Sequence, residues 1–560
     1  MSEQKRYRSK EFIKFKRNYV NALSAHQLEI CDRMTDSDRL NISMPTGTGK
    51  SRIIYSDMIN YLEDLEKDVF VLASHRLMLN TQHFSEIFEN LSIIAGTIGF
   101  IFVGSDKIDM EKFIKDTTFN NRLKDRGLNV KDLCHTTTSN LEIKQLVYEH
   151  KKADRDIIII STYHSLNRLK DVDIHTLYCD EAHLLATPKN SAMFKNNFEV
   201  IDKNVKRAYF LTATPKDLID SELEESFLMN NTEIFGERVG LTFKESVEAG
   251  YIVRPILHVC TPTNYVNDID FKQPENYTDF ILDSYIEHSD WLNKKSYDSS
   301  QIKAKLMVKC PSVPDIFKIY NILIDLKNSG DERLKDVNLF AGFSDNEKVS
   351  STENHFINNE KTRDRNEFLS KMQAMKFTEK AIILHFDILS EGINVPGITG
   401  VMFLSDNLPS LSKLLQNIGR STRLHDFDRL RLSKNELVVN NLEDWIKPYC
   451  SVIVPFTSVN SPKMKHDIAT KLKELRDTFN MQIEYVVKGE DVSDVEKDEP
   501  DSDKNKKTDK KKISAIEDIE HAIEELDKID REDDELEELR SKVNEDPDNI
   551  MDILLNSIKV

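Results

Sequence analysis

Short apolar runs that alternate with longer helical stretches limit most strongly how this chain can fold. The runs lie at 70–74, 157–162, 176–180 and 208–214, and again at 304–310, 381–386, 400–405 and 451–456. Most of their residues are β-branched or otherwise apolar, so each strand would be buried on both faces, as in a parallel sheet covered by helices on either side. The pattern predicts an α/β fold, and its repetition predicts two units of the same architecture.

The expected domain boundaries follow from this pattern and from a change in composition. A chain of 560 residues exceeds one ordinary hydrophobic core. The first domain, with a leading helix, is expected over 1–245 and the second over 246–460. A connecting segment at 461–486 and an acidic region at 487–560 would follow.

The acidic region holds most of the net charge. Residues 490–560 contain 26 Asp and Glu against 12 Lys and Arg, a balance of −14, so the first 489 residues carry only −5 of the total of −19. A nearly neutral body is compatible with a polyanionic partner. Residues 487–512 have almost no apolar side chains, which predicts a disordered linker. Apolar residues at helical spacing beyond it, such as Ile516, Ile519 and Ile523, predict amphipathic helices that either fold back on the second domain or dock on a partner protein.

The cysteine pattern and the N-terminal residues indicate in which cellular compartment the protein is expected. The six cysteines lie far apart without a CxxC pair, which argues against a zinc or disulfide framework and predicts buried thiols. The N-terminal residues are charged where a signal peptide needs an apolar centre, and the run at 91–104 is too short to span a membrane. We therefore expect an intracellular protein, with cytoplasm and nucleus both open.

The stretch NISMPTGTGKSRII at 41–54 predicts a phosphate-binding loop. Its glycines would let backbone N–H groups turn toward phosphates, Lys50 would contact the β and γ phosphates, and the Ser51 hydroxyl would bind Mg²⁺. Met44 stands where the full pattern has glycine, at the expected end of a strand. The predicted nucleotide-binding residues of this loop are Thr46, Gly47, Thr48, Gly49, Lys50 and Ser51.

Two acidic residues supply the other half of this site. Asp180 and Glu181 follow the apolar run 176–180, where a parallel sheet presents its ligand-binding edge. Asp180 would hold Mg²⁺ through its water shell. Glu181 would orient and polarise the attacking water for phosphoryl transfer.

Six blocks in one order resemble the motif series of superfamily 2 helicases. They are MPTGTGKS, ISTYHSL, DEAH, LTATP, ILSEGINVPGI and QNIGRSTR, between residues 44 and 423. Within that superfamily the sequence is most similar to type I and type III restriction motor subunits and excision-repair DNA helicases. The resemblance implies two RecA-like domains with parallel sheets flanked by helices, to which composition and spacing add the acidic, partly disordered helical tail. It also implies ATP and Mg²⁺ in a cleft between the two domains.

The resemblance assigns further residues to the nucleotide and to nucleic acid. Gln27 would read the adenine base, and Gly392 would contact ribose and phosphate. His183 would contact the segment of Thr212 and Thr214, which links the ATP site to strand movement. The residues that match nucleic-acid-binding positions are Arg76, Thr162, Thr212, Thr214 and Asn394.

The last block supplies Gln416, Arg420 and Arg423 as catalytic candidates. If the block is helical, a spacing of three residues places both guanidinium groups on one face. From the second domain they would neutralise charge that develops on the γ-phosphate, as an arginine finger does. Asn417 stands where many relatives have another arginine.

Several patterns leave alternatives open. Phe12, Phe15 and Tyr19 fit the packing stripe of a leading helix better than a base-stacking surface. His135 and His150 lack partners at metal-binding spacing. An ATP-driven DNA helicase or translocase is the leading hypothesis, beside an RNA helicase and a nucleotide-gated DNA-binding factor that recruits partners without unwinding.

Overall fold

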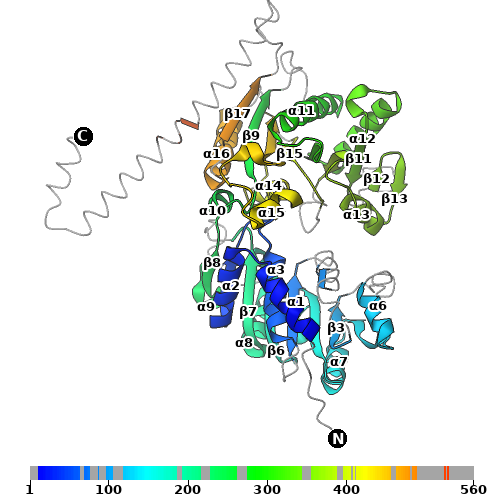
Figure 1. Cartoon of the computed structure of the whole chain (residues 1–560), viewed down its shortest axis with the longest axis vertical. Coiled ribbons are helices and arrows are strands. Elements are labelled where there is room, and N and C mark those ends of the chain that lie inside the picture. Colours follow the sequence, from blue (N-terminus) through cyan, green and yellow to red (C-terminus); the bar gives the residue numbers. More distant parts are fainter. Residues whose placement is uncertain are drawn as a thin grey trace, which may run out of the picture. The chain divides into compact units, whose positions relative to one another are not determined.

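The computed structural model of the chain contains two compact units (Figure 1). The first unit consists of the described residues up to Ile252 together with Thr422–Leu424, and the second unit contains the other described residues from Val253 onward. The structure describes residues 10–62, 68–75, 83, 86–87, 96–104, 118–185, 192–215, 228–261, 274–343, 355–386, 395–404, 408–409, 411–455, 462–479, 482–487, 523–524, 526 and 528. Each unit is an α/β structure, so the predicted fold class is confirmed.

The first unit consists of one sheet with helices on both faces. Its strands are β1 (Arg39–Ser43), β2 (Val69–Ser74), β3 (Ile98–Val103), β4 (Cys134–Thr137), β5 (Asp156–Thr162), β6 (Ile174–Asp180), β7 (Val205–Thr212) and β8 (Glu237–Gly240). Its helices are α1 (Lys10–Asn21), α2 (Ala25–Asp36), α3 (Lys50–Tyr61), α6 (Thr118–Asp125), α7 (Asn140–Lys152), α8 (Ala192–Asn204), α9 (Thr232–Phe235) and α10 (Phe243–Glu248).

All strand pairs of this sheet are parallel, in the order β4-β3-β5-β2-β6-β7-β1-β8. Alternate strand residues enter two separate cores. Phe70 and Leu72 join the core beneath α1, α2 and α3, whereas Val69 and Val71 join the core that α7 and α8 cover. Burial on both faces explains why the sequence shows continuous apolar runs instead of alternation.

Helix α1 packs its aromatic stripe against the first of these cores. Phe12 is 1% exposed, and Phe15 and Tyr19 are partly buried against the same cluster. The ring centroids of Phe15 and Tyr19 lie 5.9 Å apart. The packing interpretation of this helix is therefore confirmed.

The second unit repeats the architecture with a longer sheet. Its strands are β9 (Arg254–Thr261), β10 (Lys305–Lys309), β11 (Val337–Gly342), β12 (His355–Ile357), β13 (Glu360–Thr362), β14 (Lys380–His385), β15 (Gly400–Phe403), β16 (Tyr449–Pro455) and β17 (Gln482–Val487). Its helices are α11 (Pro274–Lys295), α12 (Val313–Asn328), α13 (Arg365–Gln373), α14 (Leu411–Ser421), α15 (Asp426–Ser433) and α16 (Pro462–Phe479). The order is β13-β12-β11-β14-β10-β15-β16-β9-β17, antiparallel only at β11-β12-β13.

Buried histidines lie between α11 and the sheet of the second unit. His288 Nδ1 is 2.9 Å from Ser451 Oγ, and its Nε2 is 2.7 Å from Thr399 Oγ1. Trp291 stacks on His288 and meets His258 edge-on. Burial lowers the pKa of His288 to about 3 and that of His258 to about 4.

Lowering the pH from 7 to 5 is expected to destabilise the second unit by about 2 kcal/mol for each of these histidines. The unfolded chain gains protons near a pKa of 6.5, whereas the folded unit gains them only near pH 4 or below. Stability is therefore full above about pH 6.5 and is lost as the pH falls below it. Urea unfolding, followed by the fluorescence of Trp291 and Trp445, measures the change. His288→Gln keeps hydrogen-bonding groups but cannot titrate, so an unchanged pH dependence in this variant would contradict the explanation.

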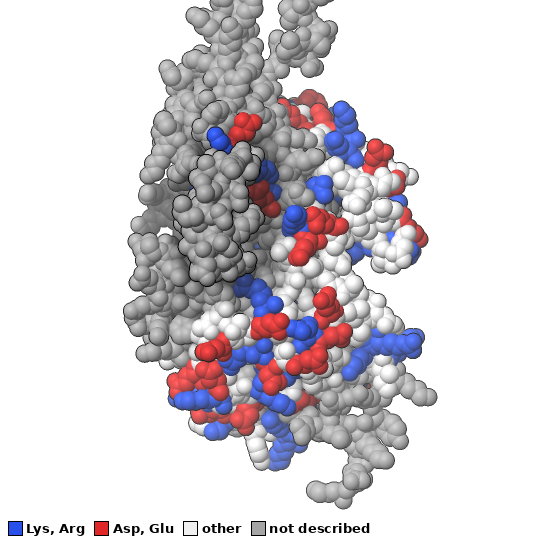
Figure 2. Space-filling model, turned by 90° about the vertical axis from the view of Figure 1, so that its left-hand side faces the viewer, with Lys and Arg blue, Asp and Glu red and all other residues white. Residues whose placement is uncertain are grey.

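Other observations bear on the compartment and charge expectations. Cys134, Cys179, Cys310 and Cys450 are buried and free, and burial raises the pKa of the Cys450 thiol to about 11. Among the described residues, no helix has both the length and the apolar character needed to cross a membrane. On the face that Figure 2 shows, basic and acidic side chains are interspersed, consistent with the nearly balanced charge of residues 1–489.

Candidate nucleotide site

The carboxyl ends of parallel strands gather the predicted site residues at one edge of the first sheet. Ser43 at the end of β1 pairs with Thr212 at the end of β7, and the neighbouring strand β6 ends at Asp180. Farther along this edge, Ser74 of β2 pairs with Thr162 of β5. The last residues of five strands, β1, β2, β5, β6 and β7, thus lie along one edge.

The phosphate loop connects β1 to α3 through two glycines with positive φ. Gly47 has φ 96° and Gly49 has φ 90°, a region that costs other residues conformational energy. Met44 is fully buried in the core, and its N–H donates to the Thr212 carbonyl oxygen at 2.9 Å. The Lys50 ammonium donates to the Met44 carbonyl oxygen at 3.1 Å. The residue that replaces glycine therefore contributes its side chain to the core and its backbone to the loop.

The beginning of α2 braces the same loop. Gln27 Nε2 donates to the Thr48 carbonyl oxygen at 2.8 Å, and Gln27 Oε1 of the same side chain accepts from the Ser24 N–H at 3.0 Å. His26 Nε2 lies 3.2 Å from the same Thr48 oxygen, and burial lowers the pKa of His26. The Gln27 side chain thus stabilises the phosphate loop through its hydrogen bond to Thr48. Its role in reading adenine stays a prediction.

Asp180 is held by a residue that the motifs did not indicate. His83 Nε2 lies 2.9 Å from Asp180 Oδ2, and both side chains are nearly fully buried. Burial would raise the pKa of the Asp180 carboxyl, but the bond to His83, its charge and the nearby Lys50 together lower it. Burial likewise opposes protonation of His83, yet Asp180 raises the pKa of that imidazole. The arrangement keeps an ionised carboxylate at the end of β6.

Glu181 begins a tight turn after β6. Its φ of 54° is left-handed, and the other described non-glycine residues with positive φ are Asp154, Asp336, Asn358 and Asn435. Asp and Asn tolerate this region far better than Glu, so the position is locally strained. Glu181 Oε2 lies 3.5 Å from His183 Nδ1. The left-handed backbone and the contact with His183 therefore together orient the Glu181 side chain at the end of β6.

His183 connects this turn to the end of β7. Its Nδ1 lies 2.9 Å from Thr212 Oγ1, and the Thr214 N–H donates to the same hydroxyl oxygen at 3.1 Å. The expected contact between His183 and the Thr212 segment is confirmed. Its role in coupling hydrolysis to movement stays a prediction.

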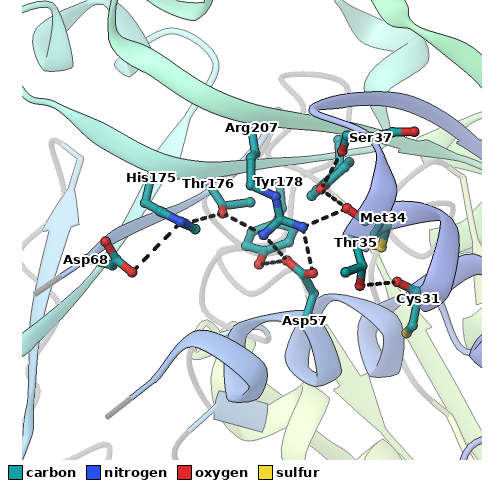
Figure 3. A network of polar contacts seen from close by, with 11 residues as sticks. Cys31, Met34, Thr35, Ser37, Asp57, Asp68, His175, Thr176, Tyr178 and Arg207 are labelled. Atoms are coloured by element: carbon teal, nitrogen blue, oxygen red, sulfur yellow. Dashed lines mark hydrogen bonds and ion pairs between the residues drawn. The ribbon is translucent and has the colours of Figure 1, made fainter. Parts of the chain in front are cut away.

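A buried polar network anchors α3 to β6 and β7, as Figure 3 shows. Arg207 Nη2 donates to Asp57 Oδ1 at 3.1 Å and to the Met34 carbonyl oxygen at 2.8 Å. The Tyr178 hydroxyl donates to Asp57 Oδ2 at 2.6 Å. Asp57 lies on the helix that begins with Lys50, and Tyr178 lies two residues before Asp180. The network therefore fixes α3 relative to two strands that end in site residues.

In the second unit, α14 carries Gln416 and Arg420 but ends at Ser421. The expectation that Arg420 and Arg423 share one helix face is wrong, because Arg423 lies beyond the last helical residue. The Lys447 ammonium donates to the Ser421 carbonyl oxygen at 2.6 Å and favours termination there. Arg420 is nearly buried at the end of this helix.

Arg420 and Lys309 lie near the buried His385 of the same unit. Burial, Lys309 and Arg420 lower the pKa of His385 well below its ordinary value. His385 ends β14, next to the end of β10 at Lys309. Two cationic side chains therefore lie near the carboxyl ends of β10 and β14.

Some predicted positions fall outside the described residues. They include Arg76, Gly392 and Asn394, and nearly all of the acidic region. The histidines that seemed isolated in the sequence are paired in space, since the rings of His135 and His150 have centroids 5.4 Å apart. The structure describes no group of three or more potential metal ligands.

Comparison with known proteins extends the likeness beyond the motifs. Residues 16–217 match a protein family described as "Type III restriction enzyme, res subunit". No curated protein matches the chain. The structure is similar to that of the ATP-dependent Type ISP restriction-modification enzyme LlaBIII bound to DNA, with a TM-score of 0.55, 15% identity, and coverage of 88% of this chain and 32% of LlaBIII.

The helicase Lhr of Mycobacterium smegmatis, bound to single-stranded DNA and AMP-PNP, matches with a TM-score of 0.48 and 14% identity. This match covers 84% of the chain and 50% of Lhr, so the chain spans at most half the length of these two proteins. The family match and the fold confirm the resemblance to superfamily 2 helicases and restriction motor subunits.

Proposed function

We propose that this superfamily 2 helicase-like protein is an ATP hydrolase that moves along nucleic acid, with DNA as its track. The observation that carries the proposal is the convergence of Lys50, Asp180 and Glu181 at the carboxyl edge of the first sheet. A glycine loop, a helix N-terminus and two consecutive acids are the parts that phosphoryl transfer from a nucleotide requires.

The residues present fit Mg²⁺. Asp180 offers a carboxylate whose pKa is lowered, and Ser51 lies in the first turn of α3 beside Lys50. An ion held by these residues would supply positive charge that neutralises the phosphates during transfer. In this proposal Ser51 and Asp180 hold the metal, Lys50 contacts the phosphates, and Glu181 orients the attacking water.

Coupling to movement would start from His183. Its contact with Thr212 joins the turn after β6 to the end of β7, so a change at Glu181 can reach Thr214 through two side chains. Thr162 at the end of β5 would contact the nucleic-acid backbone on the same edge. We further propose that Gln416, Arg420 and Arg423 act on the transferred phosphoryl group, where the two guanidinium groups would neutralise its developing charge.

DNA is favoured over RNA by the kind of protein that the family match names. An RNA helicase is the second candidate, because the sequence motifs do not distinguish contacts to a 2′-hydroxyl. A nucleotide-gated binding factor would use the same residues without productive turnover.

ATP turnover is expected to rise when DNA is added and to rise less, or not at all, with RNA of equal length. Phosphate contacts should make the activation weaken steeply with salt. Turnover should therefore be measured with duplex DNA, single-stranded DNA and RNA at several salt concentrations, together with displacement of forked and blunt duplexes. Activation by RNA alone would overturn the DNA assignment, and slow turnover that no nucleic acid stimulates would favour the binding factor.

A further inference from the structure

One buried side chain at the candidate site has no part in the proposed function so far. His83 is 4% exposed and lies between Asp180 and Tyr55. Its Nε2 is 2.9 Å from Asp180 Oδ2, and its Nδ1 is 3.1 Å from the Tyr55 hydroxyl oxygen. The Tyr55 hydroxyl in turn donates to Glu86 Oε2 at 3.0 Å. A continuous chain of hydrogen bonds therefore leads from Glu86 to the carboxylate at the end of β6.

The number of protons in this chain fixes the direction of each bond. A tyrosine hydroxyl has one proton, and Tyr55 donates it to Glu86, so its oxygen accepts from His83 Nδ1. Donation from Nδ1 to Tyr55 and from Nε2 to Asp180 requires the imidazolium cation, which has a proton on both ring nitrogens. Because both ring nitrogens have hydrogen-bond partners, the imidazole is held in a single orientation.

The chain also connects Asp180 to the helix that carries the phosphate loop. Tyr55 lies on α3, five residues after Lys50, whereas Glu86 and His83 belong to the segment after β2. Tyr55 and Glu86 also line a pocket of about 470 Å³ beside α1, together with Ser51 and Arg52. Asp180, Lys50 and Ser51 are therefore positioned relative to one another through His83 as well as through the sheet.

We propose that His83 is a positioning residue, which holds Asp180 in the one orientation that binds the Mg²⁺–nucleotide complex. Partners that hydrogen-bond a metal-binding carboxylate orient it, and their removal typically weakens metal binding by about 10–100-fold. The inference rests on the proposed function, because it assigns Asp180 to the metal. It differs from a packing role, since packing requires only a side chain of similar size whereas positioning requires a hydrogen-bond donor.

The full-length variants His83→Leu and His83→Gln separate these roles, with His150→Leu as a control for loss of a buried histidine. Binding of Mn²⁺ in the presence of ADP, followed by the electron paramagnetic resonance of free Mn²⁺, needs no turnover. We expect His83→Leu to weaken Mn²⁺ binding by about 10–100-fold, with ADP binding in EDTA unchanged. His83→Gln should keep most of the affinity because its amide can donate to Asp180. The control should bind as the unaltered protein does.

Normal Mn²⁺ affinity in His83→Leu, or equal losses in His83→Leu and His83→Gln, would overturn the proposal. Tyr55→Phe keeps the imidazole but removes the hydroxyl group that contacts it, so we expect a smaller loss of Mn²⁺ affinity than in His83→Leu. The proposal would also be overturned if Tyr55→Phe and His83→Gln kept full Mn²⁺ affinity and His83→Leu lost no more than the His150→Leu control. If the unaltered protein does not hydrolyse ATP but His83→Leu still weakens Mn²⁺ binding, the proposed function fails and this inference stands. If the protein hydrolyses ATP and His83→Leu binds Mn²⁺ normally, only the inference fails.

Discussion

Replacing Glu181 with glutamine is expected to lower ATP turnover by about 10²–10⁴-fold, the usual contribution of a positioned general base. Glutamine has nearly the same shape, and the strained φ of 54° at this position would disfavour either residue to a similar degree. The substitution therefore removes the charge and leaves the turn unchanged. Binding of ATP should persist, because Lys50 and the phosphate loop do not depend on Glu181 for their hydrogen bonds.

Phosphate release under saturating ATP measures turnover, and a fluorescent ATP analogue measures binding. Glu199→Gln is a matched control, because Glu199 is an exposed glutamate on α8 that pairs with Lys203. Turnover equal to that of the unaltered protein would remove Glu181 from the mechanism. Loss of both turnover and nucleotide binding would indicate a collapsed loop instead.

Replacing Asp57 with alanine is expected to destabilise the first unit by about 3–5 kcal/mol, the range for breaking a buried ion pair. Arg207 would then be a buried cation without its carboxylate, since the side chains of both residues are at most 5% exposed. Burial raises the pKa of Asp57, and Arg207 and Tyr178 oppose that rise, so the three groups depend on one another. The Arg207 guanidinium also stacks over the Tyr61 ring, 4.4 Å from its centroid.

The double variant Asp57→Leu with Arg207→Met should recover much of the lost stability, because it removes both buried charges together. Urea unfolding followed by circular dichroism measures the loss. Trp291 and Trp445, the only tryptophans in the sequence, both lie in the second unit and provide an internal control. A loss below about 1 kcal/mol in Asp57→Ala would show that the pair contributes no more than an exposed one.

The eight apolar runs identified in the sequence each overlap a strand, because burial on both faces leaves a direct trace in the residue pattern. The runs at 157–162 and 176–180 correspond to β5 and β6 within one residue or two at each end. Asp180 could be located because parallel strands place their last residues at a common edge. The fold class and the approximate position of the candidate nucleotide site therefore follow from periodicity and motifs.

His83 and the pair of Asp57 with Arg207 could not be found in this way. His83 reaches Asp180 across 97 positions of sequence, and Arg207 reaches Asp57 across 150, so no local spacing connects them. Arg207 lies in the first residues of β7, where a charged side chain ordinarily indicates an exposed strand end. The end of α14 was also missed, because it depends on Lys447, which is distant in the sequence.

The order of strands in the first sheet has a consequence for the durability of the candidate site. β6, β7 and β1 are each paired on both sides, whereas β4 and β8 form the margins of the sheet. Opening of such structures typically begins at margins, where fewer hydrogen bonds must break. The backbone amides that support Asp180 and Thr212 should therefore exchange with solvent only when the whole unit opens. Local opening at β4 or β8 would leave the spacing of the candidate site residues unchanged.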